Sequence, residues 1–445
     1  MIRPFRRGFP IPTPRLAVWL GAAIPLVLLT LLTPELASWV VLYPAVVVAL
    51  AVVDAWTCGD PKRLEATRSI TDGAVQGREL PVRWQLRWTG ARPARLRLED
   101  HPPMRWRERV RRARMDLDAR AVASWSYEAR PARRGTARFG PLMWRTVGAL
   151  GLMERGGGRH EDDRAIRVYP DLTAAEDDAE SSRSARLLQG LRKSRFHGEG
   201  SEFHQLRDYV RGDDLREFDW KAFAHRGRPT VREHRLERHQ RLLLVLDAGR
   251  LMTAKVGHLT RFDWAVHAAG RLARAATLVG DSVAIATFRG DLARQLPSGK
   301  GPTHLRKIAE FLIDADAGRE EGELSVALPH LLRTHPRRSL VVVFSELSDP
   351  RQAETIVRSM GRLAPKHLGL LVTQVDADLE AERARPIERA EDVYRRATAA
   401  ELHQEIDKHL RALKARGVEV VRAPADRLAA DAVTRYLDLK RRRRL

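Results

Sequence analysis

The second half of the chain alternates apolar runs with segments of helical periodicity. Four runs rich in Leu, Val and Ile are polar only at their ends: 241–247, 282–288, 339–345 and 367–375. Strands that are apolar on both sides must be covered on both faces, as in a parallel sheet flanked by helices. The pattern therefore predicts an α/β fold with a doubly wound, mainly parallel sheet over residues 241–445.

Helical patterns separate these runs and complete the predicted domain. They cover 261–279, 304–314, 323–334 and 352–363. A short late strand at 418–421 and a last helix at 427–439 follow. Residues 381–413 have the composition of an additional helical insertion.

Two apolar stretches lie near the start of the chain, at 16–33 and 36–56. Each approaches the roughly 20 residues that span a hydrocarbon core of about 30 Å. Arginines precede the first stretch, and Lys62, Arg63 and Arg68 follow the second, which places both outer flanks in the cytoplasm. Residues 1–60 are therefore predicted as a transmembrane helical hairpin, with the bulk of the chain cytoplasmic. A cleaved signal peptide is the alternative, but a second apolar stretch follows at once.

Residues 61–170 have a different pattern, of short runs that alternate apolar and polar side chains. Examples are 80–88, 94–98, 121–127 and 136–139. This period of two, with Gly and Pro between the runs, predicts a small antiparallel β-sandwich domain. Residues 171–240 are then a linker that carries a segment dense in acidic and basic residues.

The chain carries 79 Lys and Arg against 57 Asp and Glu, a formal net charge of +22. Such a charge suits an anionic membrane surface or a nucleic acid. Aromatic residues make up 6% of the chain and do not interleave with the basic tail, so nucleic acid binding is not predicted. The tail itself is either a solvated end or a contact with anionic lipid, through Lys440, Arg441, Arg442, Arg443 and Arg444.

The segment 202–220 mixes carboxylates with arginines. Three interpretations are open: a salt-bridged structural latch, a docking surface for a partner, and general acid–base catalysis. Asp214 followed by Glu217 fits a capping box at a helix start, and Phe203, Leu206, Tyr209 and Val210 have the spacing of a helix core. Nearby arginines lower carboxylate pKa values, which disfavours catalysis. The candidate partner-binding or structural residues are Glu202, Arg207, Tyr209, Gly212, Asp213, Asp214, Arg216, Asp219 and Trp220.

Motifs of known catalytic chemistry do not occur in the sequence. The glycines at 156–158 are not followed by Lys and Ser or Thr, so they form no phosphate-binding loop. Neither G-x-S-x-G nor a Cys/His pair offers a nucleophile. Cys58 is the single cysteine, which excludes an intramolecular disulfide and a cysteine-based zinc site. The chain is predicted to be no enzyme and to need no cofactor.

Asp247 and Glu346 follow two of the predicted parallel strands. Ligands of open α/β sheets bind at this carboxyl edge. Mg²⁺ requires near-octahedral oxygen ligands, of which the two carboxylates could supply two. The alternative is a pair of structural carboxylates that cap helices or pair with arginines.

Four segments carry a resemblance to a known family. They read R-R-G-T-A-R-F-G-P at 133–141, G-A-L-G-L at 148–152, V-Y-P-D at 168–171 and E-F-H-Q-L-R-D-Y-V-R-G-D-D-L-R-E-F-D-W at 202–220. With them, residues from about 62 to 379 resemble the domain-of-unknown-function 58 family. The resemblance implies a von Willebrand factor type A-like domain joined to a membrane hairpin and a β domain. It also implies a bacterial inner-membrane location and a MoxR-type AAA+ ATPase as partner.

Type A domains with a working metal site use D-x-S-x-S, a later threonine and a later aspartate. Only Asp247 matches the first element here, because Gly249 and Leu251 stand in place of the serines. Glu323 or Ser325 stands near the threonine position, and Glu346 replaces the last aspartate. The resemblance therefore implies a degenerate metal-site rim at Asp247, Gly249 and Glu346. We expect a membrane-anchored protein-binding scaffold or adaptor; the alternative is a Mg²⁺-dependent adhesion module using Asp247 and Glu346.

Overall fold

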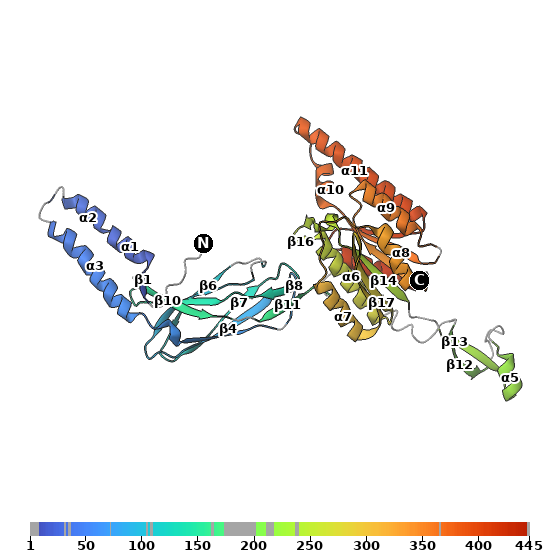
Figure 1. Cartoon of the computed structure of the whole chain (residues 1–445), viewed down its shortest axis with the longest axis horizontal. Coiled ribbons are helices and arrows are strands. Elements are labelled where there is room, and N and C mark those ends of the chain that lie inside the picture. Colours follow the sequence, from blue (N-terminus) through green and yellow to red (C-terminus); the bar gives the residue numbers. More distant parts are fainter. Residues whose placement is uncertain are drawn as a thin grey trace. The chain divides into compact units, whose positions relative to one another are not determined.

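The chain divides into two compact units, Met1–Tyr169 and Pro170–Leu445, which the computed structural model in Figure 1 draws in blue to green and in green to red. The structure describes residues 9–30, 33, 37–71, 73–103, 106, 110–161, 164–172, 202–210, 218–235, 240–364 and 366–442. Each unit has its own core and is described by itself.

The N-terminal helices are α1 (Pro14–Gly21), α2 (Ala23–Thr30) and α3 (Ala37–Thr57). Pro25 explains the break between α1 and α2, since proline has no N–H and its ring clashes with the carbonyl four residues earlier. The apolar segment Ser38–Arg63 is long enough to cross a membrane, and the apolar helix Pro14–Leu29 is shorter. The first apolar helix is thus shorter than the predicted span 16–33. The Tyr43 hydroxyl of α3 donates to the Trp19 carbonyl oxygen of α1 at 2.8 Å, which links these two helices.

The end of α3 is fixed to the β strands of the same unit by a buried carboxylate. Asp54 is fully buried and accepts hydrogen bonds from the backbone amides of Leu150, Leu152 and Met153 at 2.6–2.8 Å. A Cβ at Gly148 would lie 2.4 Å from the Asp54 carboxyl group, so only glycine allows this approach. The G-A-L-G-L motif therefore forms an anion-binding turn for the protein's own aspartate.

Three sheets form the rest of the first unit. One has the order β1 (Pro10–Pro12), β10 (Met153–His160), β9 (Leu142–Val147), β5 (Ala94–Asp100) and β6 (Arg111–Leu117). The second is β2 (Leu64–Ser69), β4 (Leu80–Trp88) and β7 (Val122–Ala129), and the third is β3 (Gly73–Val75), β11 (Ala165–Tyr169) and β8 (Gly135–Arg138). The short helix η2 (Pro61–Arg63) leads into β2. All pairings are antiparallel except β3 with β11, and β4 buries every second side chain as predicted.

A buried ion pair joins strands of two of these sheets. Arg68 of β2 pairs with Asp100 of β5 at 2.7 Å, and both side chains are fully buried. Asp100 also accepts hydrogen bonds from the indole of Trp84 at 2.8 Å and the hydroxyl of Tyr127 at 2.5 Å. The Arg68 guanidinium lies 4.5 Å from the Trp84 ring centroid. Asp100 is therefore the shared acceptor of three strands.

The second unit is built on a six-stranded sheet. Its order is β18 (Asp291–Gly299), β17 (Ser282–Arg289), β14 (Arg241–Asp247), β19 (Leu340–Phe344), β20 (Leu368–Gln374) and β21 (Glu419–Ala423). Only β18 runs antiparallel to its neighbour, which confirms the predicted mainly parallel sheet. The edge strand β18 was not predicted, because its residues are largely polar and include Pro297.

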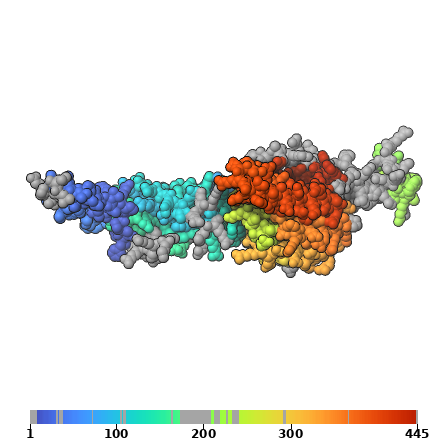
Figure 2. All heavy atoms as spheres, turned by 90° about the horizontal axis from the view of Figure 1, so that it is seen from above, coloured from blue at the N-terminus to red at the C-terminus, as the bar shows by residue number. Residues whose placement is uncertain are grey.

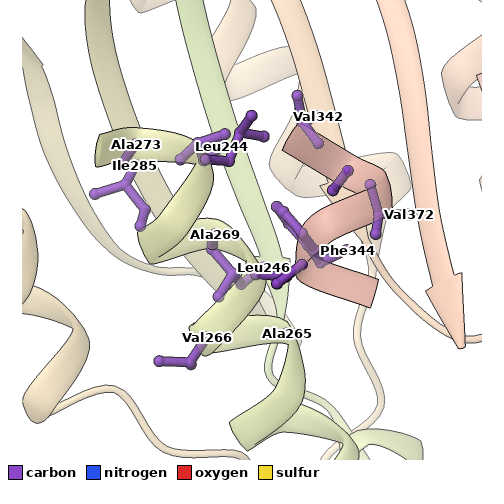
Figure 3. Close-up of a cluster of buried hydrophobic side chains, with 14 of the residues drawn as sticks. Leu244, Leu246, Ala265, Val266, Ala269, Ala273, Ile285, Val342, Phe344 and Val372 are labelled. Carbon is purple, nitrogen blue, oxygen red and sulfur yellow. The ribbon is translucent and has the colours of Figure 1, made fainter. Parts of the chain in front are cut away.

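Helices cover both faces of this sheet. One face carries α6 (Arg261–Leu278), α7 (Gly301–Ile313) and α12 (Leu428–Arg441), and the other α8 (Leu324–Thr334), α9 (Pro350–Gly361) and α11 (Ala390–Ala415). Along β14, Leu244 and Leu246 pack under α6 with Phe344 (Figure 3), whereas Leu243 and Val245 face the opposite cluster. This alternation is why the strand is apolar throughout.

The additional helical insertion is α10 (Ala377–Ala384) followed by α11, as expected from the sequence. Its orange-red atoms lie on the outside of the unit in the space-filling view (Figure 2). In α11 the buried residues recur every seven positions, at Asp392, Ala399, Ile406 and Leu413. Ile406 and Leu413 join the core cluster of this face together with the partly buried Leu402 and Leu410, and the long helix packs against α9 and β21.

The remaining elements of the second unit are short. A hairpin of β12 (Glu202–Asp208) and β13 (Thr230–Arg235) carries α5 (Trp220–Arg226). The helix η5 (Arg250–Thr253) and the pair β15 (Lys255–Val256) with β16 (Leu259–Thr260) connect β14 to α6. The helical spacing inferred for 203–210 is wrong for 203–208, which form a strand because they pair with 230–235.

The Asp100 network generates a stability prediction. Asp100→Ala leaves the Arg68 guanidinium buried without its carboxylate, which costs about 3–5 kcal/mol. We expect urea-dependent proteolysis of the full chain to report this loss in fragments of the first unit. Asp116→Ala is the control, because Asp116 is exposed and lies 3.9 Å from Arg95 in an exposed pair. Equal stability of the two variants would contradict a central role for Asp100.

Candidate functional site

The carboxyl edge of the six-stranded sheet brings together residues from three parallel strands and their following loops. Asp247 ends β14, Ser345 and Glu346 follow β19, and Asp376 follows β20. Parallel strands end at one edge of a sheet, so these side chains are gathered by topology alone. The edge is called the carboxyl rim below and comprises Asp247, Gly249, Arg261, Gly322, Ser345, Glu346, Gln352 and Asp376.

Asp247 is fully buried and both of its carboxylate oxygens are engaged. Oδ1 accepts a hydrogen bond from the Gly249 amide at 2.8 Å. Oδ2 accepts from the Ser345 hydroxyl at 2.5 Å and from the Gln352 side-chain amide at 2.8 Å. Three donors from three segments thus surround one carboxylate, and none of them is a cation.

Gly249 and Gly322 allow two rim loops to approach each other closely. A Cβ at Gly322 would lie 2.3 Å from Asp247 Oδ1, and a Cβ at Gly249 would lie 2.6 Å from the Gly322 amide nitrogen. Backbone hydrogen bonds from Arg250 to Glu320 and from Gly318 to Ala248, both 2.8 Å, join the same loops. Gly249 therefore supplies close approach and a backbone donor in place of a metal-binding hydroxyl.

Glu346 is buried and is balanced by an arginine of the protein itself. The Arg261 guanidinium lies 3.5 Å from Glu346 Oε2 and 2.5 Å from Asp376 Oδ2. Gln374 donates to the Arg261 carbonyl oxygen at 2.8 Å, which fixes the first turn of α6 against β20. Arg261 is therefore a positive charge held between two carboxylates of neighbouring strands.

Burial sets the protonation behaviour of both rim carboxylates. It raises the pKa of Asp247 above its ordinary value, against the opposing effect of the hydrogen bonds from Ser345, Gly249 and Gln352. It likewise raises the pKa of Glu346, which the Arg261 charge opposes. Burial outweighs the fixed donors in each case, so the ionised carboxylates are held at a cost in the folded state.

The other residues expected near a metal site do not join this cluster. Glu323 is the exposed N-cap residue of α8 and Ser325 is exposed on the same helix. Leu251 is half-buried in η5. Over the ranges that the structure describes, no group of three or more His, Cys, Asp or Glu side chains is arranged to hold a metal ion.

The outer part of the rim is strongly charged and accessible. Arg250 and Glu321 have side chains 53% and 74% exposed and lie 3.5 Å apart. Glu320 is 69% exposed and pairs with Arg289 at 3.5 Å. The buried carboxylates Asp247 and Glu346, with their partners in the protein, therefore lie beneath exposed side chains of both signs of charge.

The signature segment is only partly described. Glu202 and Arg207 belong to β12, where they pair with Arg235 and Val231 of β13. The expected capping box and the other candidates of this stretch lie outside the described residues: Gly212, Asp213, Asp214 and Arg216. Asp219 caps α5 by accepting from the amides of Lys221 and Ala222 at 3.0 Å. This contact is a helix cap, and the three interpretations of the segment stay predictions.

An aromatic cluster accompanies this cap. The Phe218 ring lies 4.5 Å from Trp220 and 6.4 Å from Tyr209, measured between ring centroids. Trp220 remains 70% exposed. Tyr209 therefore packs against aromatic neighbours of the hairpin, and Trp220 presents most of its surface.

The basic tail is divided between paired and exposed residues. Lys440 donates to the buried carboxylate of Asp281, which also accepts from the hydroxyl of Tyr436. Arg441 lies 3.9 Å from Asp438, and Arg442 is exposed. Arg443 and Arg444 lie outside the described residues. The Lys440 ammonium is thus engaged inside the fold, and lipid contact stays a prediction for the rest of the tail.

Comparison with known families identifies this half of the chain. A family model described as "Protein of unknown function DUF58" matches residues 205–421. Over this segment the chain belongs to the DUF58 family. The match runs from the β12 hairpin to the last strand of the sheet and includes Asp247, Arg261 and Glu346.

Similar proteins occur in mycobacteria. Uncharacterized proteins of Mycobacterium bovis and Mycobacterium tuberculosis are 28% identical to this chain over 194 residues. These alignments cover 43% of this chain and 60% of each relative, so the chain spans less than two thirds of the relatives' length.

Solved structures give only weak likenesses. An alkylpurine DNA glycosylase of Pseudomonas fluorescens has a TM-score of 0.16 and 14% identity, and covers 33% of this chain and 45% of its own. A β-glucuronidase of Bacteroides uniformis has a TM-score of 0.16 and 9% identity, over 81% of this chain and 33% of its own. Scores this low carry no argument about fold or function.

Sequence reasoning located Asp247, Gly249 and Glu346 but not the groups that neutralise and cap them. Arg261 and Gln352 come from the first turns of α6 and α9, and Gly322 precedes α8. The position of these residues in the sequence could have indicated them, because the first turn of a helix that follows a parallel strand lies at the carboxyl edge. An arginine there is unfavourable for the helix dipole and is a sign of a nearby carboxylate.

The raised pKa of Asp247 predicts a pH-dependent effect of Asp247→Asn. Above the ordinary value of 3.8 the folded state holds its proton longer than the unfolded state, so the free energy of unfolding falls as pH rises toward the raised pKa. The asparagine variant lacks this fall while its oxygen and amide still pair with Gly249, Ser345 and a rotated Gln352. Its stability relative to wild type should therefore increase with pH from about 4 upward.

Urea denaturation of the full chain across a pH series measures this difference. Asp316→Asn changes an exposed aspartate in the same unit and is the matched control. A pH-independent difference between wild type and Asp247→Asn would show that Asp247 is not held at a cost in the folded state.

Proposed function

We propose that this chain is a membrane-anchored scaffold that binds a partner protein at its carboxyl rim without a divalent ion. One observation carries the proposal: the rim carboxylates are already satisfied by Ser345, Gln352, the Gly249 amide and Arg261. A cation would have to displace these donors and compete with a fixed guanidinium. The exposed charges above them remain available to a protein surface.

The anchor in this proposal is a helical hairpin that crosses a bacterial inner membrane twice. The length and hydropathy of α3 support one crossing, and the apolar helices α1 and α2 supply the other in a bent form. The bulk of the chain is then cytoplasmic, in line with the basic flanks. The Asp54 contacts couple the end of α3 rigidly to the β strands of its unit.

The six-stranded unit acts in this proposal as a von Willebrand factor type A-like domain with a degenerate metal site. The aspartate at the end of β14, the helices on both faces and the rim loops support that assignment. In the same proposal the strands of the first unit form a β-sandwich, supported by the core that strands of its separate sheets share.

The partner that we propose is a MoxR-type AAA+ ATPase, on the basis of the family resemblance. Arg250, Glu320 and Glu321 form an exposed mixed-charge surface, which favours steering and register between proteins more than burial of apolar area. No catalytic role is proposed. General acid–base catalysis needs a carboxyl group that is free to exchange a proton with a substrate, whereas Asp247 and Glu346 are buried and paired with groups of the protein.

Site-specific photocrosslinking tests this function. A photoreactive residue placed at Arg250 in the full chain, expressed at native level in its bacterial host, should crosslink to an AAA+ ATPase subunit identified by mass spectrometry. The same residue placed at Arg358, exposed on α9 in a pair with Glu354, is the control and should give no such adduct. Equal adducts at both positions, or none at Arg250, would refute binding at the rim.

A further inference from the structure

A second site lies at the opposite edge of the six-stranded sheet, where the parallel strands begin. It is a pocket of about 690 Å³, a volume within the ordinary range of ligand sites. Arg241 and Ser282 open β14 and β17 on one side of it, and Ser339 precedes β19. Lys300 at the end of β18 and Arg337 after α8 complete its charged lining. The pocket shares no residue with the carboxyl rim.

The charge of this pocket has one sign. Arg241, Lys300 and Arg337 line it, and no Asp or Glu is among the described residues of the lining. The neighbouring carboxylate of Asp281 is buried and engaged by Lys440, Tyr436 and the Gln240 amide. Three cations that line one pocket, with no carboxylate among its described lining residues, create a local positive potential.

The start of α7 adds to this potential. Lys300 is the N-cap residue, makes no side-chain capping hydrogen bond, and no acidic residue occupies the first turn. A cation at a helix N-terminus opposes the helix dipole, whereas an anion there is stabilised. The sequence thus breaks a local rule in the lining of the pocket that Arg241 and Arg337 share, which is typical of a functional position.

Two histidines also lie at this edge. His335 lines the pocket, and its Nδ1 faces the Leu331 carbonyl oxygen at 2.9 Å. Burial lowers the pKa of His367, and the charges of Lys366 and His335 lower it further. The positive field of this edge therefore reaches a buried histidine.

Two hydroxyl groups of the pocket already contact backbone carbonyl oxygens of the protein, which leaves fewer groups to donate to a ligand. Ser339 donates to the Arg337 carbonyl oxygen at 2.9 Å, and Ser282 faces the Gln240 carbonyl oxygen at 3.4 Å. Ser298 is exposed beside Lys300. The available donors are thus mainly guanidinium and ammonium groups, which match phosphate oxygens better than they match a neutral ligand.

We propose that this pocket binds a phosphate-bearing anion through Arg241, Lys300 and Arg337, at the start of α7. Its volume exceeds what a single inorganic phosphate fills, so the phosphate belongs to a larger group. A lipid headgroup and a soluble polyphosphate share the required chemistry. The same three cations serve either source.

Hydrogen–deuterium exchange of the full chain in nanodiscs distinguishes the two sources. Peptides covering 295–306 and 334–340 are followed in zwitterionic phosphatidylcholine discs, with or without pyrophosphate, and in discs that also contain phosphatidylglycerol. Protection by pyrophosphate assigns a soluble ligand, and protection by phosphatidylglycerol alone assigns a headgroup. Absence of protection in both arms overturns the proposal.

A charge variant ties the protection to the pocket. Lys300→Gln combined with Arg337→Gln should abolish the protection and weaken pyrophosphate or lipid binding by at least about tenfold. Arg358→Gln removes an exposed cation from α9 and should leave binding unchanged. Both positions in the double variant are exposed, so an unchanged thermal midpoint shows that the fold is intact. Protection that persists in the double variant, or that is lost equally in Arg358→Gln, refutes the site.

Discussion

The ion pair of Arg261 with Glu346 and Asp376 determines what the carboxyl edge of the sheet can do. Two strands, β19 and β20, direct a carboxylate to this edge, and one of the two is almost completely buried. Without a cation between them, their repulsion in a poorly hydrated site would be severe. A guanidinium is suited to this place because it stays protonated and offers several donors in one plane. Its position at the start of α6, against the helix dipole, is maintained by these two partners.

Asp247 differs from this pair, because three hydrogen-bond donors surround it and none of them is a cation. Its three donors take three of the roughly four acceptor sites of the carboxylate, and Gly322 packs closely against Oδ1, which has one donor. A metal site built on an α/β edge needs carboxylates whose oxygens point into an open position. Here the corresponding space is taken by Gly322 and by side chains of the protein. The rim is consequently a rigid, closed surface, which favours recognition by shape and exposed charge.

The sequence allowed prediction of most of the second unit, because its strands are apolar on both faces and its helices fall between them. It did not reveal β18, whose polar residues suit an edge strand, or β12, where Phe203 and Leu206 fit helical spacing and strand pairing equally well. It pointed to Asp247 and Glu346 through their places after strands. Arg261 and Gln352 could not be assigned, since the direction of a first-turn side chain depends on how its helix packs.

In the first unit, too, sequence patterns predicted secondary structure but not the side-chain contacts. Alternation in 80–88 was enough to predict a strand, and the apolar run before Trp56 was enough to predict a helix. The structural role of Asp54 could not be predicted, because its partners are backbone amides almost one hundred residues later in the chain. The G-A-L-G-L motif appeared only as a family likeness until those amides were seen around one carboxylate.

Calorimetric titration of the full chain in zwitterionic nanodiscs with Mg²⁺ tests the central claim most directly. We expect no saturable heat at millimolar ion, in wild type and in Asp247→Asn alike, because the protein's own donors already pair with the rim carboxylates. Stoichiometric binding in wild type that disappears in Asp247→Asn would contradict it.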